Sequence, residues 1–242
     1  MNKPKEILND LQSAVHKELL KINGFKKSGR TFNRISSDGI IEVINFQSGR
    51  HEFGNEIPGL RENLYGNFTI NIGICIPEYY EHRFDKTKKF YQEYDCSIRT
   101  RIGSLIKDGE DVWWELRQSY LEEQIDRIIQ LLNDVGLKWL EQLNSRENIY
   151  QNWESIAKNY NLSNNAKLNI ATIQILNNIE SGKDLYKEYY KSTEKENHKE
   201  WLREDAKILN VELQPAHTSD NDVRLAIAKS ATYHYFVSSN IR

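Results

Sequence analysis

The segment Phe68–Ile76 (FTINIGICI) constrains the fold more than any other part of the chain. Bulky apolar residues occupy every second position, and Thr, Asn, Gly and Cys fill the positions between them. Successive side chains of a β-strand point to opposite faces of the sheet, so this alternation predicts a strand with one apolar and one polar face. We therefore expect an antiparallel sheet with one face packed on a core.

Further strands and a first helix complete the predicted sheet domain. Residues 4–23 repeat apolar side chains at three- and four-residue spacing, which is typical of an amphipathic helix. We predict strands at Thr31–Ser36 and Ile40–Ser48, joined in a hairpin by a tight Ser-Asp-Gly turn, and a fourth strand near Tyr94–Leu105. The predicted fold class is α+β, with the N-terminal helix packed on a four-stranded antiparallel sheet.

After Trp114 the apolar period changes from that of a strand to that of a helix. Helices are predicted over Ser119–Leu143, Glu147–Tyr160, Ser163–Ile179 and Asp184–Leu209. The tail beyond Pro215 suits either a helix or a strand. We predict an α+β domain over residues 1–145 and a mainly helical extension over residues 146–242, with no evident flexible linker between them.

The polar face of the predicted sheet is the strongest candidate for a binding site. Its members are Asn45, Gln47, Thr69, Asn71, Cys75, Asp95, Ser97, Arg99 and Arg101. An arginine pair flanked by carboxamides can hold a carboxylate, a phosphate or a peptide backbone through charge-assisted hydrogen bonds. The alternative is that the trailing helices cover this face and that its charges are neutralised within the chain. The candidate binding residues from this face are Asn45, Gln47, Asn71, Asp95, Arg99 and Arg101.

Three residues outside the predicted strands join this set. Adjacent Trp113 and Trp114 point in different directions, so one anchors the core while the other could contact a partner, although core packing of both is the alternative. Arg50 follows the second strand of the hairpin. The basic stretch Lys26–Arg34 (KKSGRTFNR) could meet phosphate, but a solvated loop is the simpler interpretation.

Composition and spacing argue against several function classes. The chain has 33 Lys+Arg and 35 Asp+Glu, a balance that does not favour nucleic acid as the main partner. The six His are scattered, and no metal-ligand spacing or glycine-rich phosphate loop occurs, so we expect no metal and no cofactor. With two Cys, no long apolar run and no signal segment, we expect a cytoplasmic protein without a membrane partner. By the predicted register Cys75 lies on the polar face and Cys96 in the core.

A weak helix-turn-helix pattern lies in Trp153–Ala171. A first helix, a turn around Tyr160–Ser163 and a capped second helix can be traced, but Lys167 stands where an apolar residue should be. The second helix also has no arginine with which to contact base edges. An ordinary helical hairpin is the preferred interpretation, with DNA binding as the alternative.

The order of motifs in the first half resembles the bacterial "domain of unknown function 4304" family. The residues that carry the resemblance are Gly24–Phe32 (GFKKSGRTF), Val43–Arg50 (VINFQSGR), Phe68–Gly73 (FTINIG), Asp95–Arg101 (DCSIRTR), Gly103 and Trp113-Trp114. The similarity spans about residues 15–145. It implies a small α+β domain of bacterial cytosolic proteins and supplies no activity or catalytic residue, and the helical extension lies outside it.

Three functional hypotheses follow from these observations. The first is a non-catalytic bacterial interaction protein, immunity-like or accessory to defence, that binds another protein, because Tyr, Trp and Arg dominate protein interfaces. The second is an enzyme that acts on a phosphorylated or nucleotide-like substrate, with Arg99 and Arg101 holding the anion and Asp95 as acid or base. The third is a DNA-binding regulator that uses Trp153–Ala171.

Overall fold

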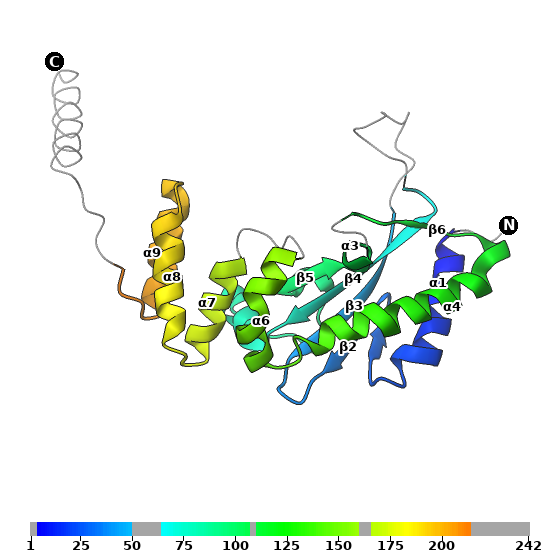
Figure 1. The fold of residues 1–242 in the computed structure, drawn as a ribbon, viewed down its shortest axis with the longest axis horizontal. Coiled ribbons are helices and arrows are strands. Elements are labelled where there is room, and N and C mark those ends of the chain that lie inside the picture. The colour runs from blue at the N-terminus through cyan, green and yellow to red at the C-terminus, as the bar shows by residue number, and fades with distance from the viewer. Residues whose placement is uncertain (1–3, 50–63, 107–109, 160–165, 214–242) are drawn as a thin grey trace, which may run out of the picture. The chain divides into compact units, whose positions relative to one another are not determined.

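The computed structural model describes residues 4–49, 64–106, 110–159 and 166–213 (Figure 1). The chain forms two compact units, residues 1–189 and residues 190–242. Arg50, the turn around Tyr160–Ser163 and the tail beyond Pro215 lie outside the described residues. Helices and an antiparallel sheet together confirm the predicted α+β class with a helical C-terminal half.

The sheet of the described chain has six strands, two more than predicted. Its path is β1 (Lys26–Ser28), β2 (Thr31–Ile35), β3 (Ile41–Ser48), β4 (Asn67–Cys75) and β5 (Ile98–Arg101), and β6 (Trp114–Glu115) also pairs with β4. All the pairings are antiparallel. The two additional strands have three and two residues, which is too short for an alternating pattern to be recognised.

The predicted fourth strand is much shorter than expected. A single 3-10 turn, η2 (Glu93–Asp95), precedes β5, and helix α3 (Ile102–Ile106) follows it directly. The Asp95 carboxylate accepts the Gln92 backbone N–H at 2.8 Å within a capping box. Such local side-chain bonds offer the backbone an alternative to a sheet ladder. The prediction that Asp95 lies on a strand beside Arg99 and Arg101 is therefore wrong.

Helices cover the apolar face of the sheet. This layer contains α1 (Pro4–Val15), the π-helical turn η1 (His16–Leu20), α4 (Leu121–Leu131), η4 (Leu132–Gly136) and α5 (Leu137–Glu141). Phe32, Ile44 and Ile72 are fully buried and stand next to one another across three strands. The predicted packing of the N-terminal helix on the sheet is confirmed by one core cluster that joins it to these strands.

A second, smaller cluster lies on the opposite face, at one end of β3 and β4. Its members are Ile41, Val43, Cys75, Tyr80, Tyr91 and Cys96. Residues 86–96, which we call the strap, bring Tyr91 and Cys96 to this face. A Cβ at Gly73 would stand 2.8 Å from Cys96 Cβ, so the strap approaches where β4 has no side chain. Cys75 and Cys96 therefore lie on the same face of the sheet, and the prediction of opposite faces is wrong.

The first helices of the extension pack with the sheet domain. Helices α6 (Arg146–Asn159) and α7 (Ala166–Leu176) belong to the unit of residues 1–189. The boundary between the two units falls within α8 (Ser181–Ser192), and α9 (Glu196–Ile208) belongs to the second unit. Arg146 donates two 2.7 Å hydrogen bonds to Glu78 on α2 (Pro77–Phe84) and one of 3.0 Å to Asp38. The two compact units divide the chain between residues 189 and 190.

Candidate functional site

A row of polar residues crosses four strands on the face away from the helices. Thr31, Asn45, Asn71 and Arg101 are direct cross-strand neighbours on β2, β3, β4 and β5. Asn45 Nδ2 donates to Thr31 Oγ1 at 2.9 Å, and Arg101 Nε donates to Asn71 Oδ1 at 3.3 Å. Asn71 Nδ2 donates to Gln47 Oε1 at 2.9 Å. The structure thus brings the predicted carboxamides together with Arg101 in one hydrogen-bonded network.

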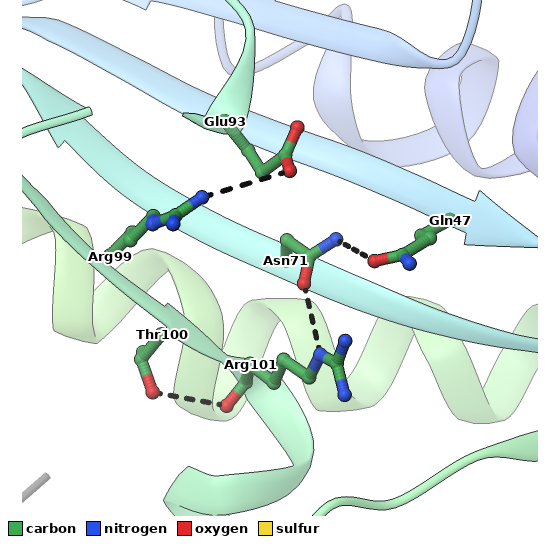
Figure 2. Close-up of a pocket in the computed structure, with 6 residues that line it drawn as sticks. All are labelled: Gln47, Asn71, Glu93, Arg99, Thr100 and Arg101. Atoms are coloured by element: carbon green, nitrogen blue, oxygen red, sulfur yellow. Dashed lines mark hydrogen bonds and ion pairs between the residues drawn. The ribbon is translucent and has the colours of Figure 1, made fainter. Parts of the chain in front are cut away.

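A pocket of about 280 Å³ opens beside this network (Figure 2). It is lined by Gln47, Asn71, Glu93, Arg99, Thr100 and Arg101. In Figure 2 these residues gather over β3, β4 and β5, and helices pass behind the strands. Pockets for small molecules and cofactors usually measure about 300–1,000 Å³, so this one is at the small end of that range. All its lining residues precede α3, so the trailing helices contribute none.

Arg101 is held by partners from within the chain. Its guanidinium pairs with Asp111 and lies 5.1 Å from the centre of the Trp113 ring, a cation–π distance. Trp113 Nε1 donates to the same Asp111 oxygen at 3.0 Å. Thr69, another residue of the predicted polar face, donates to the Val112 carbonyl at 3.0 Å. These contacts hold the Arg101 side chain in place in the lining of the pocket.

Arg99 differs from Arg101 in both exposure and pairing. Its side chain is 54% exposed, against 32% for Arg101. Its described carboxylate partner is Glu93, with Nη1 and Oε1 3.9 Å apart, which is longer than a hydrogen bond. Arg99 thus offers a guanidinium group to a ligand at the mouth of the pocket.

Asp95 does not line the pocket. Its carboxylate is buried, and both of its oxygens accept from Lys88 Nζ at 2.8 Å. The hydrogen bond to Asp95 raises the pKa of the Lys88 ammonium, so Lys88 carries its charge at neutral pH. Glu93 takes the position that we predicted for Asp95. The sequence does place two acidic residues close together, in Glu93-Tyr94-Asp95. Glu93 faces Arg99 because this segment forms a turn and not the predicted strand.

The two tryptophans point to opposite faces, and both are half-buried. Trp114 pairs with Phe68 in the ladder and packs on it with ring centres 5.6 Å apart, against the apolar core. Trp113 instead contacts Arg101 beside the pocket. Of the candidate binding residues, the structure therefore assembles Asn45, Gln47, Asn71, Arg99, Arg101 and Trp113, separates Asp95 and Trp114, and does not describe Arg50.

The competing sites are less favoured by the structure. Six of the eleven residues of α7 are buried, and Asn169 bonds both Tyr79 and the Ser97 carbonyl, so this helix presents little surface to DNA. Burial raises the pKa of the Cys75 and Cys96 thiols, which disfavours a nucleophilic role. In the described part of the chain no cluster of three or more His, Cys, Asp or Glu residues could hold a metal ion. No helix of the described ranges is long and apolar enough to span a membrane.

Comparison with known proteins supplies a family and no function. No curated protein and no solved structure matches the chain significantly. The family described as "Domain of unknown function (DUF4304)" matches residues 16–142, just over half of the chain. The match includes the sheet and every residue that lines the pocket, and it ends before α6. The chain therefore belongs to the DUF4304 family.

Proposed function

We propose that this chain is a non-catalytic binding protein whose partner is another protein, and that a partner side chain docks in the pocket beside Arg99. The observation that carries the proposal is the contrast between Arg99 and its surroundings. Arg99 is exposed, and its one carboxylate partner among the described residues is distant, whereas the amides beneath it are already hydrogen-bonded. An immunity or accessory defence role in a bacterial cytoplasm is one setting in which such binding would serve.

The hydrogen-bonded network lowers the entropic cost of binding a partner. Because Asn45, Asn71 and Arg101 are held by one another and by Asp111, little side-chain freedom is lost when a partner docks. Arginine and tryptophan are among the residue types that most often dominate protein interfaces; here Arg99 lines the pocket with Arg101, and Trp113 contacts Arg101. The pocket volume leaves room for a protruding side chain of a partner.

An enzymatic function is less favoured. The acid or base assigned from the sequence was Asp95, and its carboxylate is bound to Lys88 instead of facing the pocket. Glu93 is the carboxylate that remains at the pocket, and it faces Arg99. Binding, rather than proton transfer, is the chemistry that these groups suit.

The experiment compares protein capture by three forms of the full chain. Tagged wild type, Arg99→Ala and Arg127→Ala are incubated with a bacterial lysate, and retained proteins are measured by quantitative mass spectrometry. Arg127 is an exposed arginine on α4, in the helix layer on the other side of the sheet, so it controls for the loss of one surface charge. Thermal unfolding confirms that all three forms fold.

We expect a set of proteins that wild type and Arg127→Ala retain and that Arg99→Ala loses. Charge-assisted hydrogen bonds contribute about 1.5–3 kcal/mol each, so the loss for a direct partner should be about tenfold or more. Equal retention by all three forms would contradict the proposal, as would equal loss from both variants.

A further inference from the structure

The charged residues around the pocket form two ion pairs, and the charged groups are much closer together in one pair than in the other. Arg101 is bound closely by Asp111 and is also hydrogen-bonded to Asn71. Arg99 is opposed by Glu93 across 3.9 Å, where a charge-assisted hydrogen bond would measure about 2.7–2.9 Å. Arg101 and Asp111 are therefore in direct contact, whereas Arg99 and Glu93 are too far apart for a hydrogen bond.

We propose that Glu93 is an internal competitor, and that the pocket accepts the carboxylate of a partner's Glu or Asp side chain, which replaces Glu93 at Arg99. This inference rests on the proposed function, because it names the chemical group that the partner presents. It makes Glu93 the residue that sets the affinity of the site, although no pattern in the sequence assigned it a role.

The backbone around Glu93 explains why the pair stays open. Glu93 is the first residue of η2, whose capping box joins Gln92 and Asp95. Asp95 is bound to Lys88, and Gln92 accepts a 2.6 Å hydrogen bond from Thr31. These contacts hold η2 on both sides of Glu93. An incoming carboxylate has no such tether and can approach the Arg99 guanidinium with both oxygens.

The same site supplies a second donor. Gln47 accepts from Asn71 through Oε1, and among the described residues its NH2 group has no hydrogen-bond acceptor. Gln47 and Arg99 line the same pocket. Together they present one cationic and one neutral donor, which suits the two oxygens of a carboxylate.

The charge balance favours a carboxylate over a phosphate. Glu93 and Asp111 both remain near the pocket, and a phosphate group carries about −1.5 to −2 charges against the −1 of a carboxylate. Arg101 cannot compensate because Asp111 already neutralises it. A free chain terminus is usually held by a nest of backbone N–H groups, whereas the lining here consists of side chains of strands and a turn.

Blocked tripeptides test this inference without knowledge of the partner. The full chain is labelled with ¹⁵N, and the Arg99 Nε–Hε signal, assigned with the Arg99→Lys variant, is followed during titration. The probes are acetyl-Gly-Glu-Gly-amide, its Gln and phosphoserine counterparts, and acetyl-Gly-Gly-Gly with a free carboxylate. We expect the Glu peptide to shift this signal most, and Glu93→Gln to tighten its binding about two- to fivefold, as release from an exposed ion pair allows.

Any of four results would overturn the inference: no response to the Glu peptide, unchanged or weaker binding in Glu93→Gln, tighter binding of the phosphopeptide, or an equal response to the free terminus. Glu115→Gln is the control, because Glu115 pairs with exposed Arg117 away from the pocket lining. If the peptide titration contradicts this inference but protein capture still depends on Arg99, the proposed function remains supported. The reverse result would show that the pocket binds carboxylates but that Arg99 serves no protein partner.

Discussion

The two ends of one sheet face, on the same two strands, have opposite character. At one end, Val43 of β3 clusters with Tyr91 and Cys96 of the strap, and Cys96 packs over Gly73 of β4. At the other end, Asn45 and Asn71 support the pocket. The difference lies in what the strands present: small or apolar residues pack against the strap, whereas the hydrogen-bonded amides lie beside a pocket that the strap borders through Glu93. The extent of the pocket is therefore set by where the strap can dock.

The largest expected effect comes from filling the space under the strap. In Gly73→Ala the new Cβ would stand 2.8 Å from Cys96 Cβ and Sγ and 3.1 Å from the Ile98 carbonyl oxygen. Either the strap or β5 must move, which costs about 2–3 kcal/mol in the free energy of unfolding. Urea denaturation measures this change. An unchanged midpoint would show that the strap is not packed on Gly73.

The next effect tests how the strap is anchored. Asn33 is buried, and its amide donates to the Tyr91 carbonyl at 3.0 Å and accepts the Tyr91 N–H at 2.8 Å. Asn33→Ala leaves both backbone groups buried without these partners, so we expect a loss of about 2 kcal/mol. Asn152→Ala is the control, because Asn152 is exposed and bonds only within its own helix.

Asn33→Ala should also make the cysteines under the strap more accessible to thiol reagents. Cys75 and Cys96 are buried, and burial raises the pKa of both thiols, so in the native wild type they should react with a thiol reagent roughly a hundredfold more slowly than in unfolded chain. In Asn33→Ala we expect faster labelling of both residues, and in Asn152→Ala the wild-type rate. Equal rates in the two variants would contradict an anchoring role for Asn33.

A smaller effect separates the arginines of the open end. Arg101→Ala removes a donor to Asn71, the partner of Asp111 and the cation over Trp113, so we expect a loss of about 1 kcal/mol in stability. Arg117→Ala removes an arginine whose pair with Glu115 is more than half exposed on both sides, and it should be nearly neutral. Equal losses in both variants would mean that the network around Arg101 adds no stability.

The sequence predicted the class of the fold and the amide row, because alternation along β4 is unbroken and the period of two fixes which side chains share a face. It failed around Asp95, where the strand was predicted from Tyr94 but β5 begins only at Ile98, after η2 and its capping box. Cys96 was misplaced for the same reason, because it lies in the strap and not on a strand, whereas Cys75 lies on the predicted face of β4. The strap was missed because its contacts join residues such as Asn33 and Tyr91, which are far apart in the chain.

The smallest expected effect on stability is also the one that defines the binding site. Arg99→Ala removes a side chain that is 54% exposed and paired only across 3.9 Å, so the free energy of unfolding should change by less than about 0.5 kcal/mol. Arg99 and Arg101 leave the same strand on the same side, yet one should contribute to stability and the other only to binding. Urea denaturation of both variants measures the contrast. A loss for Arg99→Ala as large as that for Arg101→Ala would show that Arg99 is engaged within the fold, and the pocket would then have no guanidinium to offer a partner.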